Sequence, residues 1–110
     1  MTTPKTHYYD QWGNLKCPPA KTVEENHNGD FIKIFLYEYT ACFYFGYQIK
    51  LGKIIQQKKA NITDQPLRTV ETARIAAQNT IIDICRKNKA MKRIFEDFTV
   101  IKYNQQELFD

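Results

Sequence analysis

The chain has 110 residues, of which 43% are hydrophobic, 25% charged and 14% aromatic, with four glycines and four prolines. This composition supports one small hydrophobic core and excludes a wholly disordered, collagen-like or low-complexity chain. The formal net charge is +4, and between Tyr39 and Phe95 eleven Lys and Arg residues stand against three acidic ones. A basic body can attract polyanions, but lysine is equally a common solubilising residue, so charge alone leaves both interpretations open.

Cysteine usage and hydropathy bear on the compartment. The three cysteines (Cys17, Cys42 and Cys85) are odd in number and too widely spaced for a disulfide framework or a zinc knuckle. The first nine residues lack the apolar segment of a secretory signal, and no stretch of 18 residues is free of charge. We therefore expect a cytoplasmic protein with no membrane association.

Residues 1–29 are predicted to form an extended N-terminal arm. They contain three of the four prolines, including the Pro18-Pro19 pair, and a polar run from Glu24 to Gly29. Trp12, the single tryptophan, is expected to pack onto the core, because an indole covers a large apolar area in one contact.

Three β-strands are expected after the arm. Residues 31–40 are rich in β-branched and aromatic side chains and apolar on both faces, which predicts a central strand or one whose outer face is covered by the arm. Residues 41–51 alternate with a period of two, as in a strand with one buried face. Residues 53–62 predict a third, more polar strand, whose lysines suit an exposed edge.

A long helix is predicted over residues 70–87, with Thr69 as its N-cap. Its apolar stripe includes Ala73, Ala77 and Ile81, whereas Gln78 is expected to face water. A second short helix is expected over residues 89–98, and a further strand is considered over residues 99–103.

These elements predict an α+β fold in which a three-stranded antiparallel sheet is covered by a long helix. A single domain then spans residues 30–103, and residues 104–110 form a C-terminal tail peptide. The β-β-β-α order over residues 30–88, with the helix entry Thr69-Val70-Glu71-Thr72-Ala73, resembles small domains of the double-stranded-RNA-binding and HicB-like antitoxin families. This resemblance implies a body that binds nucleic acid or acts as an antitoxin.

No residue pattern indicates catalysis, a cofactor or a metal site. The two histidines, His7 and His27, lie at no ligand spacing from a cysteine or carboxylate. The carboxylate pairs Glu24-Glu25 and Glu96-Asp97 are adjacent in sequence, so their side chains should diverge. We expect a protein that is not an enzyme and that holds neither cofactor nor metal.

One basic segment stands out near the end of the predicted long helix. Five positive residues fall within eight positions: Arg86, Lys87, Lys89, Lys92 and Arg93. They are candidate contacts to the phosphates of a nucleic acid. Alternatively, they are solvent-exposed charges that stabilise a helix C-terminus through its macrodipole.

The last residues of the chain contain a short linear motif. Gln105, Leu108 and Phe109 match the pattern Gln-x-x-Leu-Phe, which resembles the peptide by which bacterial replication and repair proteins dock onto the sliding β clamp. The resemblance implies that Leu108 and Phe109 enter a hydrophobic cleft and that Gln105 fixes the register by hydrogen bonds. The alternative is that Leu108 and Phe109 fold back onto the core of their own chain.

Three functional hypotheses follow from these patterns. The first is a small, non-catalytic adaptor or regulator of DNA metabolism that docks on the sliding clamp through its C-terminal peptide. The second is a nucleic-acid-binding or antitoxin-like module that acts through its basic body. The third is a homo-oligomeric structural domain that uses the aromatic strand over residues 31–39 as its interface.

Overall fold

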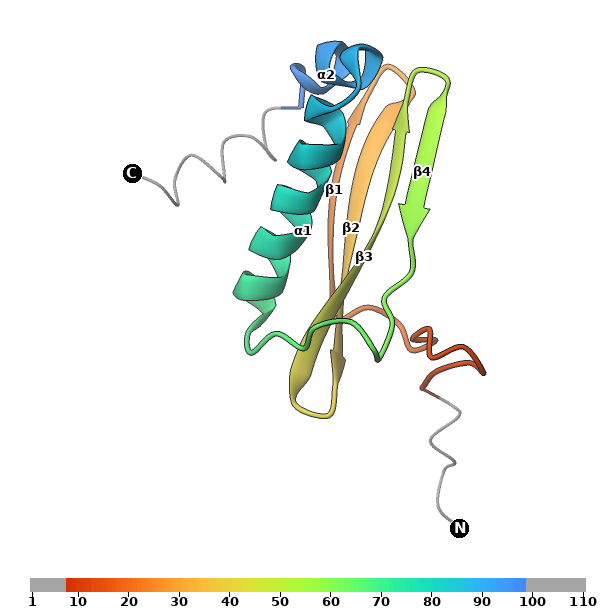
Figure 1. Cartoon of the computed structure of the whole chain (residues 1–110), viewed down its shortest axis with the longest axis vertical. Helices are drawn as coiled ribbons and strands as arrows, with labels where there is room; N and C mark the ends of the chain where they lie inside the picture. The colour runs from red at the N-terminus through yellow and green to blue at the C-terminus, as the bar shows by residue number, and fades with distance from the viewer. Residues whose placement is uncertain (1–7, 99–110) are drawn as a thin grey trace.

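The computed structural model describes residues 8–98 of the chain, so the strand considered over residues 99–103 and the tail over residues 104–110 lie outside the described residues. The described part is a two-layer α+β structure in which an antiparallel sheet is covered on one face by a long helix (Figure 1). The strands are β1 (Lys21–His27), β2 (Asp30–Tyr39), β3 (Cys42–Leu51) and β4 (Ile54–Lys58), and the helices are α1 (Val70–Arg86) and α2 (Lys89–Phe95).

The sheet has four strands in the order β1-β2-β3-β4, so the prediction of three strands is wrong. The additional strand, β1, lies in the segment that the sequence assigned to the arm. Its residues are mostly polar, and Val23 packs against the core as a partly buried side chain. Polar side chains are tolerated because β1 is an edge strand, held by its backbone pairing with β2 from Lys21↔Leu36 to His27↔Asp30.

Two-residue turns connect the first three strands. Asn28 and Gly29 join β1 to β2 with φ values of 52° and 87°, the left-handed conformation that asparagine and glycine adopt readily. Thr40 and Ala41 join β2 to β3 with φ values of 50° and 62°, although neither residue type favours that region. The second turn is therefore imposed by the pairing of β2 with β3, and its two residues carry no turn signal of their own.

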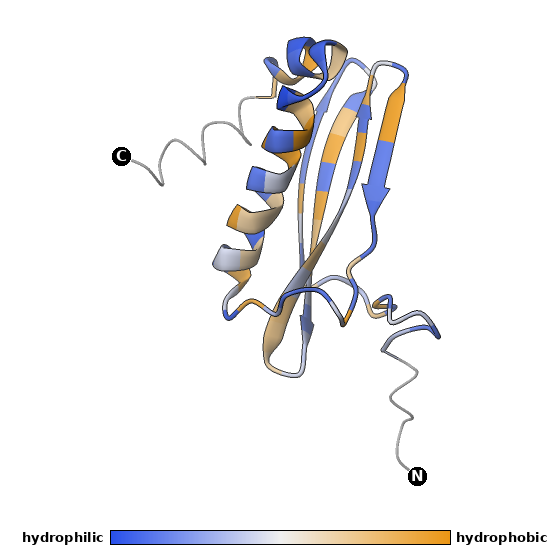
Figure 2. Ribbon diagram, in the orientation of Figure 1, coloured by the Kyte–Doolittle hydropathy of each residue, from blue (hydrophilic) through white to orange (hydrophobic). Residues whose placement is uncertain are grey.

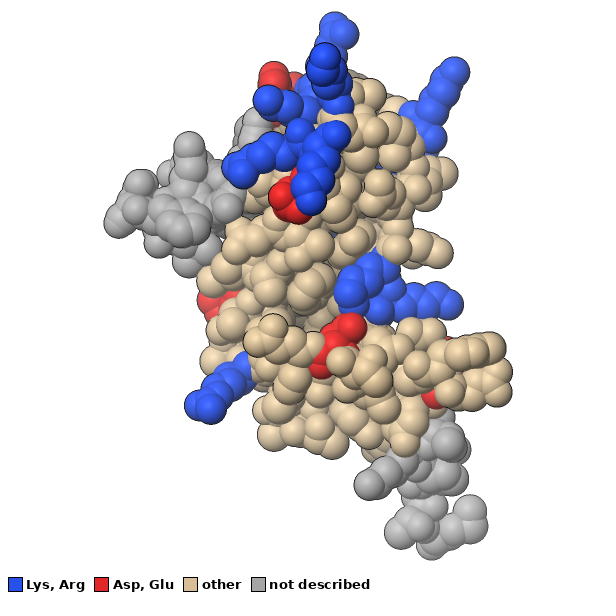
Figure 3. Space-filling model, viewed as in Figure 1, with Lys and Arg blue, Asp and Glu red and all other residues tan. Residues whose placement is uncertain are grey.

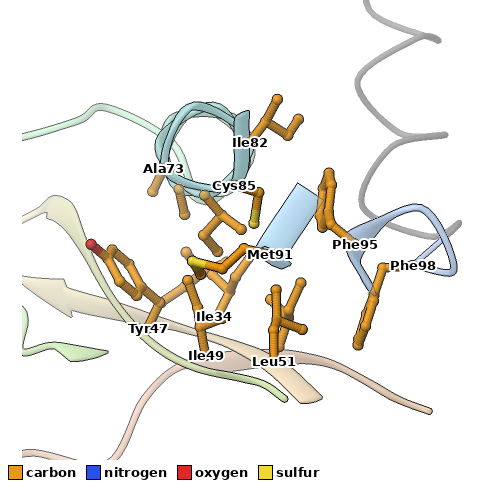
Figure 4. Close-up of a cluster of buried hydrophobic side chains, with 14 residues drawn as sticks. Ile34, Tyr47, Ile49, Leu51, Ala73, Ile82, Cys85, Met91, Phe95 and Phe98 are labelled. Carbon is orange, nitrogen blue, oxygen red and sulfur yellow. The ribbon is translucent and has the colours of Figure 1, made fainter. Parts of the chain in front are cut away.

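The main core lies between α1 and the inner face of the sheet. Alternate residues of β2 and β3 are fully buried there, among them Ile34, Ile49 and Leu51, and the strands alternate in hydropathy accordingly (Figures 2 and 4). The small side chains of Ala73 and Ala77 bring α1 close to this face, and both are fully buried. The predicted helix, its N-cap Thr69 and its alanine stripe are thus confirmed.

One residue of α1 contradicts its predicted orientation. Gln78 is fully buried, and neither its Nε2 nor its Oε1 has a hydrogen-bond partner among residues 8–98. A buried amide without partners loses its hydrogen bonds to water and gains none in return. The buried Gln78 side chain therefore lowers the stability of the fold.

A second, smaller cluster covers one end of the outer face of the sheet. The arm turns back on itself at the isolated bridge Tyr9↔Leu15 and pairs with the segment after β4 at Asn14↔Asn61. Leu15, Tyr44 and Ala60 are buried together in this cluster. Trp12 lies in the same part of the arm but is 71% exposed, so the prediction that it packs onto the core is wrong.

Candidate nucleic-acid interface

The five candidate phosphate contacts gather at the junction of α1 and α2, and all five side chains are exposed. We call this group the basic cluster; it comprises Arg86, Lys87, Lys89, Lys92 and Arg93. Figure 3 shows Lys and Arg side chains concentrated at this end of the molecule. The structure therefore brings together in space the residues that the sequence placed in one segment.

The junction is held by buried anchors on the opposite side of the same short segment. Cys85 at the end of α1 and Met91 and Phe95 of α2 belong to the main core (Figure 4). Asn88 caps α2, because its side chain accepts a hydrogen bond from the backbone N–H of Met91 at 3.1 Å. Because these anchors hold one side of the segment in the core, the basic residues lie on its solvent-exposed side.

Helix macrodipoles account for part of the basic cluster. Arg86 lies in the last turn of α1, and Lys92 and Arg93 lie in the last turn of α2, where positive charge is stabilising. Lys89 opens α2, where positive charge is unfavourable, and the first turn of α2 has no acidic residue to offset it. Helix electrostatics therefore leave Lys89 unexplained.

Acidic residues partly offset the basic cluster. Asp83 pairs with Lys87 at 2.9 Å across one helical turn, but both side chains are strongly exposed, so the pair contributes little to stability. Glu96 and Asp97 follow α2 directly and are exposed as well.

Neighbouring lysines extend the basic cluster to different degrees. The turn between β3 and β4 contacts α2, since a Cβ at Gly52 would lie 3.1 Å from Cδ1 of Ile94, and this turn carries the exposed Lys53 beside the cluster. Lys58 is engaged elsewhere, because its Nζ lies 2.5 Å from Oδ2 of Asp64. Lys50 is likewise paired, at 3.8 Å from Asp30.

The side chains of β1 include one histidine and two adjacent carboxylates. Nε2 of His27 lies 2.5 Å from Oε2 of Glu25, a pair that the sequence analysis missed although an i, i+2 spacing on a strand places both side chains on one face. Glu24 points to the opposite face and approaches Lys33 at 4.0 Å, so the two adjacent carboxylates diverge as predicted. Within residues 8–98, no group of three or more His, Cys, Asp and Glu side chains is arranged to hold a metal ion.

Cys85 is a structural thiol. Burial raises its pKa to about 11, so the thiol stays protonated at neutral pH. A protonated, buried thiol is a poor nucleophile and behaves as a small hydrophobic side chain.

The clamp-motif residues Gln105, Leu108 and Phe109 lie outside the described residues. Along residues 8–98, no helix has the length and apolar character needed to cross a membrane.

Comparison of the chain with protein-family models, with characterised proteins and with solved structures finds no match. The resemblances to the clamp-binding peptide and to β-β-β-α domains therefore stay predictions.

Proposed function

We propose that this protein is a small non-catalytic adaptor of DNA metabolism, whose body binds the phosphate backbone of nucleic acid through the basic cluster. The observation that carries the proposal is the gathering of five exposed cationic side chains at one helix junction. Arg and Lys side chains are the usual partners of phosphate oxygens, and such contacts position a protein on nucleic acid without reading its sequence.

Lys89 distinguishes phosphate binding from simple helix stabilisation. Lys89, Lys92 and Arg93 are spaced i, i+3 and i+4, so they lie on one face of α2. A charge that opposes the macrodipole at the start of α2, on the same face as two further cations, is better explained by an anionic partner than by the helix itself.

Salt dependence of duplex binding tests this proposal. We expect the triple variant K89Q/K92Q/R93Q to weaken binding of a labelled DNA duplex and to lower the slope of log K against log salt by about 0.9 for each phosphate that is no longer neutralised. The matched control is K21Q/R68Q, which removes two exposed charges flanking the other end of α1. Equal salt slopes for the triple variant and the unmodified protein contradict the proposal.

The tail peptide supplies the second part of the proposed adaptor. The support is the match of Gln105, Leu108 and Phe109 to the clamp-binding pattern. Two adjacent apolar side chains on a short polar peptide suit insertion into a hydrophobic cleft of another protein.

Titration of purified bacterial sliding clamp with the full chain tests docking. We expect L108A/F109A to abolish binding, whereas Q106A/E107A, two substitutions in the same tail outside the pattern, leaves it nearly unchanged. Equal binding by the L108A/F109A variant, or no binding by the unmodified protein, contradicts clamp docking and leaves the duplex experiment as an independent test.

A further inference from the structure

The outer face of the sheet contains a cavity of about 260 Å³ at the border between the open strands and the arm. The partly exposed rings of Phe35 and Tyr37 line it from β2. Gln48 and Gln57 line it from β3 and β4, and Lys16 and Lys59 contribute from the arm and from the segment after β4. Aromatic, amide and cationic groups thus converge from separate parts of the chain.

One wall of the cavity exists because residue 46 is a glycine. Gly46 lies directly opposite Phe35 in the register of β2 and β3. The segment after β4 crosses over it so closely that a Cβ at position 46 would lie 2.7 Å from the carbonyl oxygen of Lys58. The arm fastens this segment, since the Leu15 N–H donates to the Ala60 carbonyl at 2.8 Å. The wall beside Phe35 is therefore fixed backbone.

Two side-chain amides line the cavity beside the rings of Phe35 and Tyr37. Gln48 and Gln57 are direct partners across β3 and β4, and both side chains are exposed. Neither amide has a hydrogen-bond partner in the described part of the chain, so each offers one carbonyl acceptor and two N–H donors. Such a donor and acceptor set matches the edge of a nucleobase.

The rim charges that form no ion pair or side-chain hydrogen bond within residues 8–98 are positive. Lys16 and Lys59 are exposed and form no ion pair with residues 8–98. The acidic residue at the rim, Asp10, is occupied: it accepts hydrogen bonds from the backbone N–H groups of Trp12 and Asn14, each at 2.9 Å, and from the Asn14 side chain at 3.2 Å. Desolvation raises the pKa of Asp10, but these hydrogen bonds, together with the nearby positive charge of Lys59, outweigh it and hold the pKa below its usual value.

A second aromatic residue continues the surface along β2. Phe31 lies on the same face four residues before Phe35, about 13 Å away at the usual rise of a strand. Lys33 lies between them, with its Nζ 4.8 Å from the centre of the Phe31 ring. Stacked bases of a duplex are only about 3.4 Å apart along each strand and have covered faces, so rings at this spacing suit an unstacked single strand.

We propose that this cavity binds single-stranded nucleic acid, with one unpaired base stacked on Phe35, its edge toward Gln48 and Gln57, and its flanking phosphates beside Lys16 and Lys59. The volume lies just below the range of about 300–1,000 Å³ usual for whole small-molecule sites, which suits one base with the sugar–phosphate chain outside. A second copy of the chain is a poorer occupant, because self-association would bring the unpaired lysines of both copies together. The site is separate from the basic cluster and does not depend on it.

Fluorescence anisotropy with labelled oligothymidine, oligouridine and a duplex of the same length tests the site in the full-length protein. We expect F35L to weaken single-strand binding about tenfold, in line with the loss of one stacked base, and to leave duplex binding unchanged. K16Q/K59Q should lower the salt slope for single strands by about 0.7 for each phosphate that is no longer neutralised. The control K21Q should leave single-strand binding unchanged. The two oligonucleotides show whether DNA or RNA is preferred.

Q57A provides a second variant on the exposed edge strand that preserves the fold if F35L does not, and it should also weaken single-strand binding. The proposal is overturned if the unmodified protein does not bind single strands, or if F35L and Q57A bind them as the unmodified protein does. It is also overturned if light scattering shows a dimer that F35L converts to a monomer, since the surface then joins two copies. If K89Q/K92Q/R93Q loses single-strand binding while F35L and Q57A keep it, the result supports the proposed function and contradicts this site.

Discussion

The inner and outer faces of the sheet are built by the same strands, yet they are covered very differently. On the inner face, Ile32, Ile34 and Leu36 of β2 are completely buried beneath α1. On the outer face, the intervening residues Phe31 and Phe35 are only partly buried, and Ile55 of β4 is 70% exposed. The arm covers the outer face at one end, over Tyr44, and leaves the rest open.

This difference separates the stabilising surface from the surface available to a partner. A helix of 17 residues lies along the inner face and buries a continuous aliphatic layer. The arm forms a short bridge and a small cluster, so it buries less area and leaves aromatic rings near solvent. Apolar groups that stay exposed on one face of a small domain are candidate contacts for a ligand or partner.

The largest expected effect is the loss of an inner-face side chain. Ile34→Ala should lower the free energy of unfolding by about 3 kcal/mol, because it leaves a cavity in the main core. Ile55→Ala, the same chemical change on the exposed outer face, should change it by less than about 0.5 kcal/mol. Urea denaturation of both variants measures the difference, and equal destabilisation would contradict the assignment of the two faces.

Loss of the arm's anchor should have a smaller effect. Leu15→Ala should cost about 2 kcal/mol, because Leu15 is 9% exposed and belongs to the smaller cluster. In this variant, hydrogen exchange at the backbone amide of residue 15, which donates to Ala60, should accelerate more than exchange at the amides of β2 and β3. Uniform acceleration throughout the sheet would instead show that the arm and the main core unfold as one unit.

Removal of the buried amide should act in the opposite direction. Gln78→Leu should raise the free energy of unfolding by about 1–2 kcal/mol, since it replaces a buried amide that has no partner in the described part of the chain with an apolar group of similar length. Gln56→Leu on the exposed edge strand serves as the control and should have little effect on stability. Thermal unfolding that shows no gain for Gln78→Leu would indicate that the amide is hydrogen-bonded in solution.

Thiol reactivity distinguishes the two faces without changing stability. Cys17 and Cys42 are partly exposed beside the outer cluster, whereas Cys85, near the end of α1, is 1% exposed and belongs to the main core. At pH 8, a thiol reagent should modify Cys17 and Cys42 in the folded protein, and Cys85 only after unfolding, because burial raises its pKa to about 11 and blocks access. Because the folded pKa is the higher one, the stabilising contribution of the protonated thiol is present at neutral pH and is lost as the pH rises toward 11. Rapid reaction of all three thiols in the folded state contradicts the burial of Cys85.

Several elements could be predicted because their signal is local. Thr69 and the repeated alanines identify α1, and the alternation in residues 42–51 identifies β3. β1 could not be predicted in the same way, since a polar edge strand has almost no hydrophobic period and its clearest signal is the Asn28-Gly29 turn. The turn at Thr40 and Ala41 has no local signal at all, and the pairing of two long strands decides it.

The two candidate sites also differ in whether their signal is local in the sequence. The basic cluster could be predicted because its residues are close in sequence and solvent-exposed at a helix junction. The cavity beside Phe35 could not, because Gln48, Gln57 and Lys16 are distant in sequence and meet only through the sheet register and the folding of the arm.

The amino-acid sequence by itself determined the helix with its cap, the alternating strands and the grouping of positive charge, because each depends on neighbours within one or two turns or pleats. Only the tertiary structure decided that β1 joins the sheet, that Gln78 is buried and that Trp12 is exposed. These outcomes depend on which distant segment covers which face, and no period within a single segment specifies that choice.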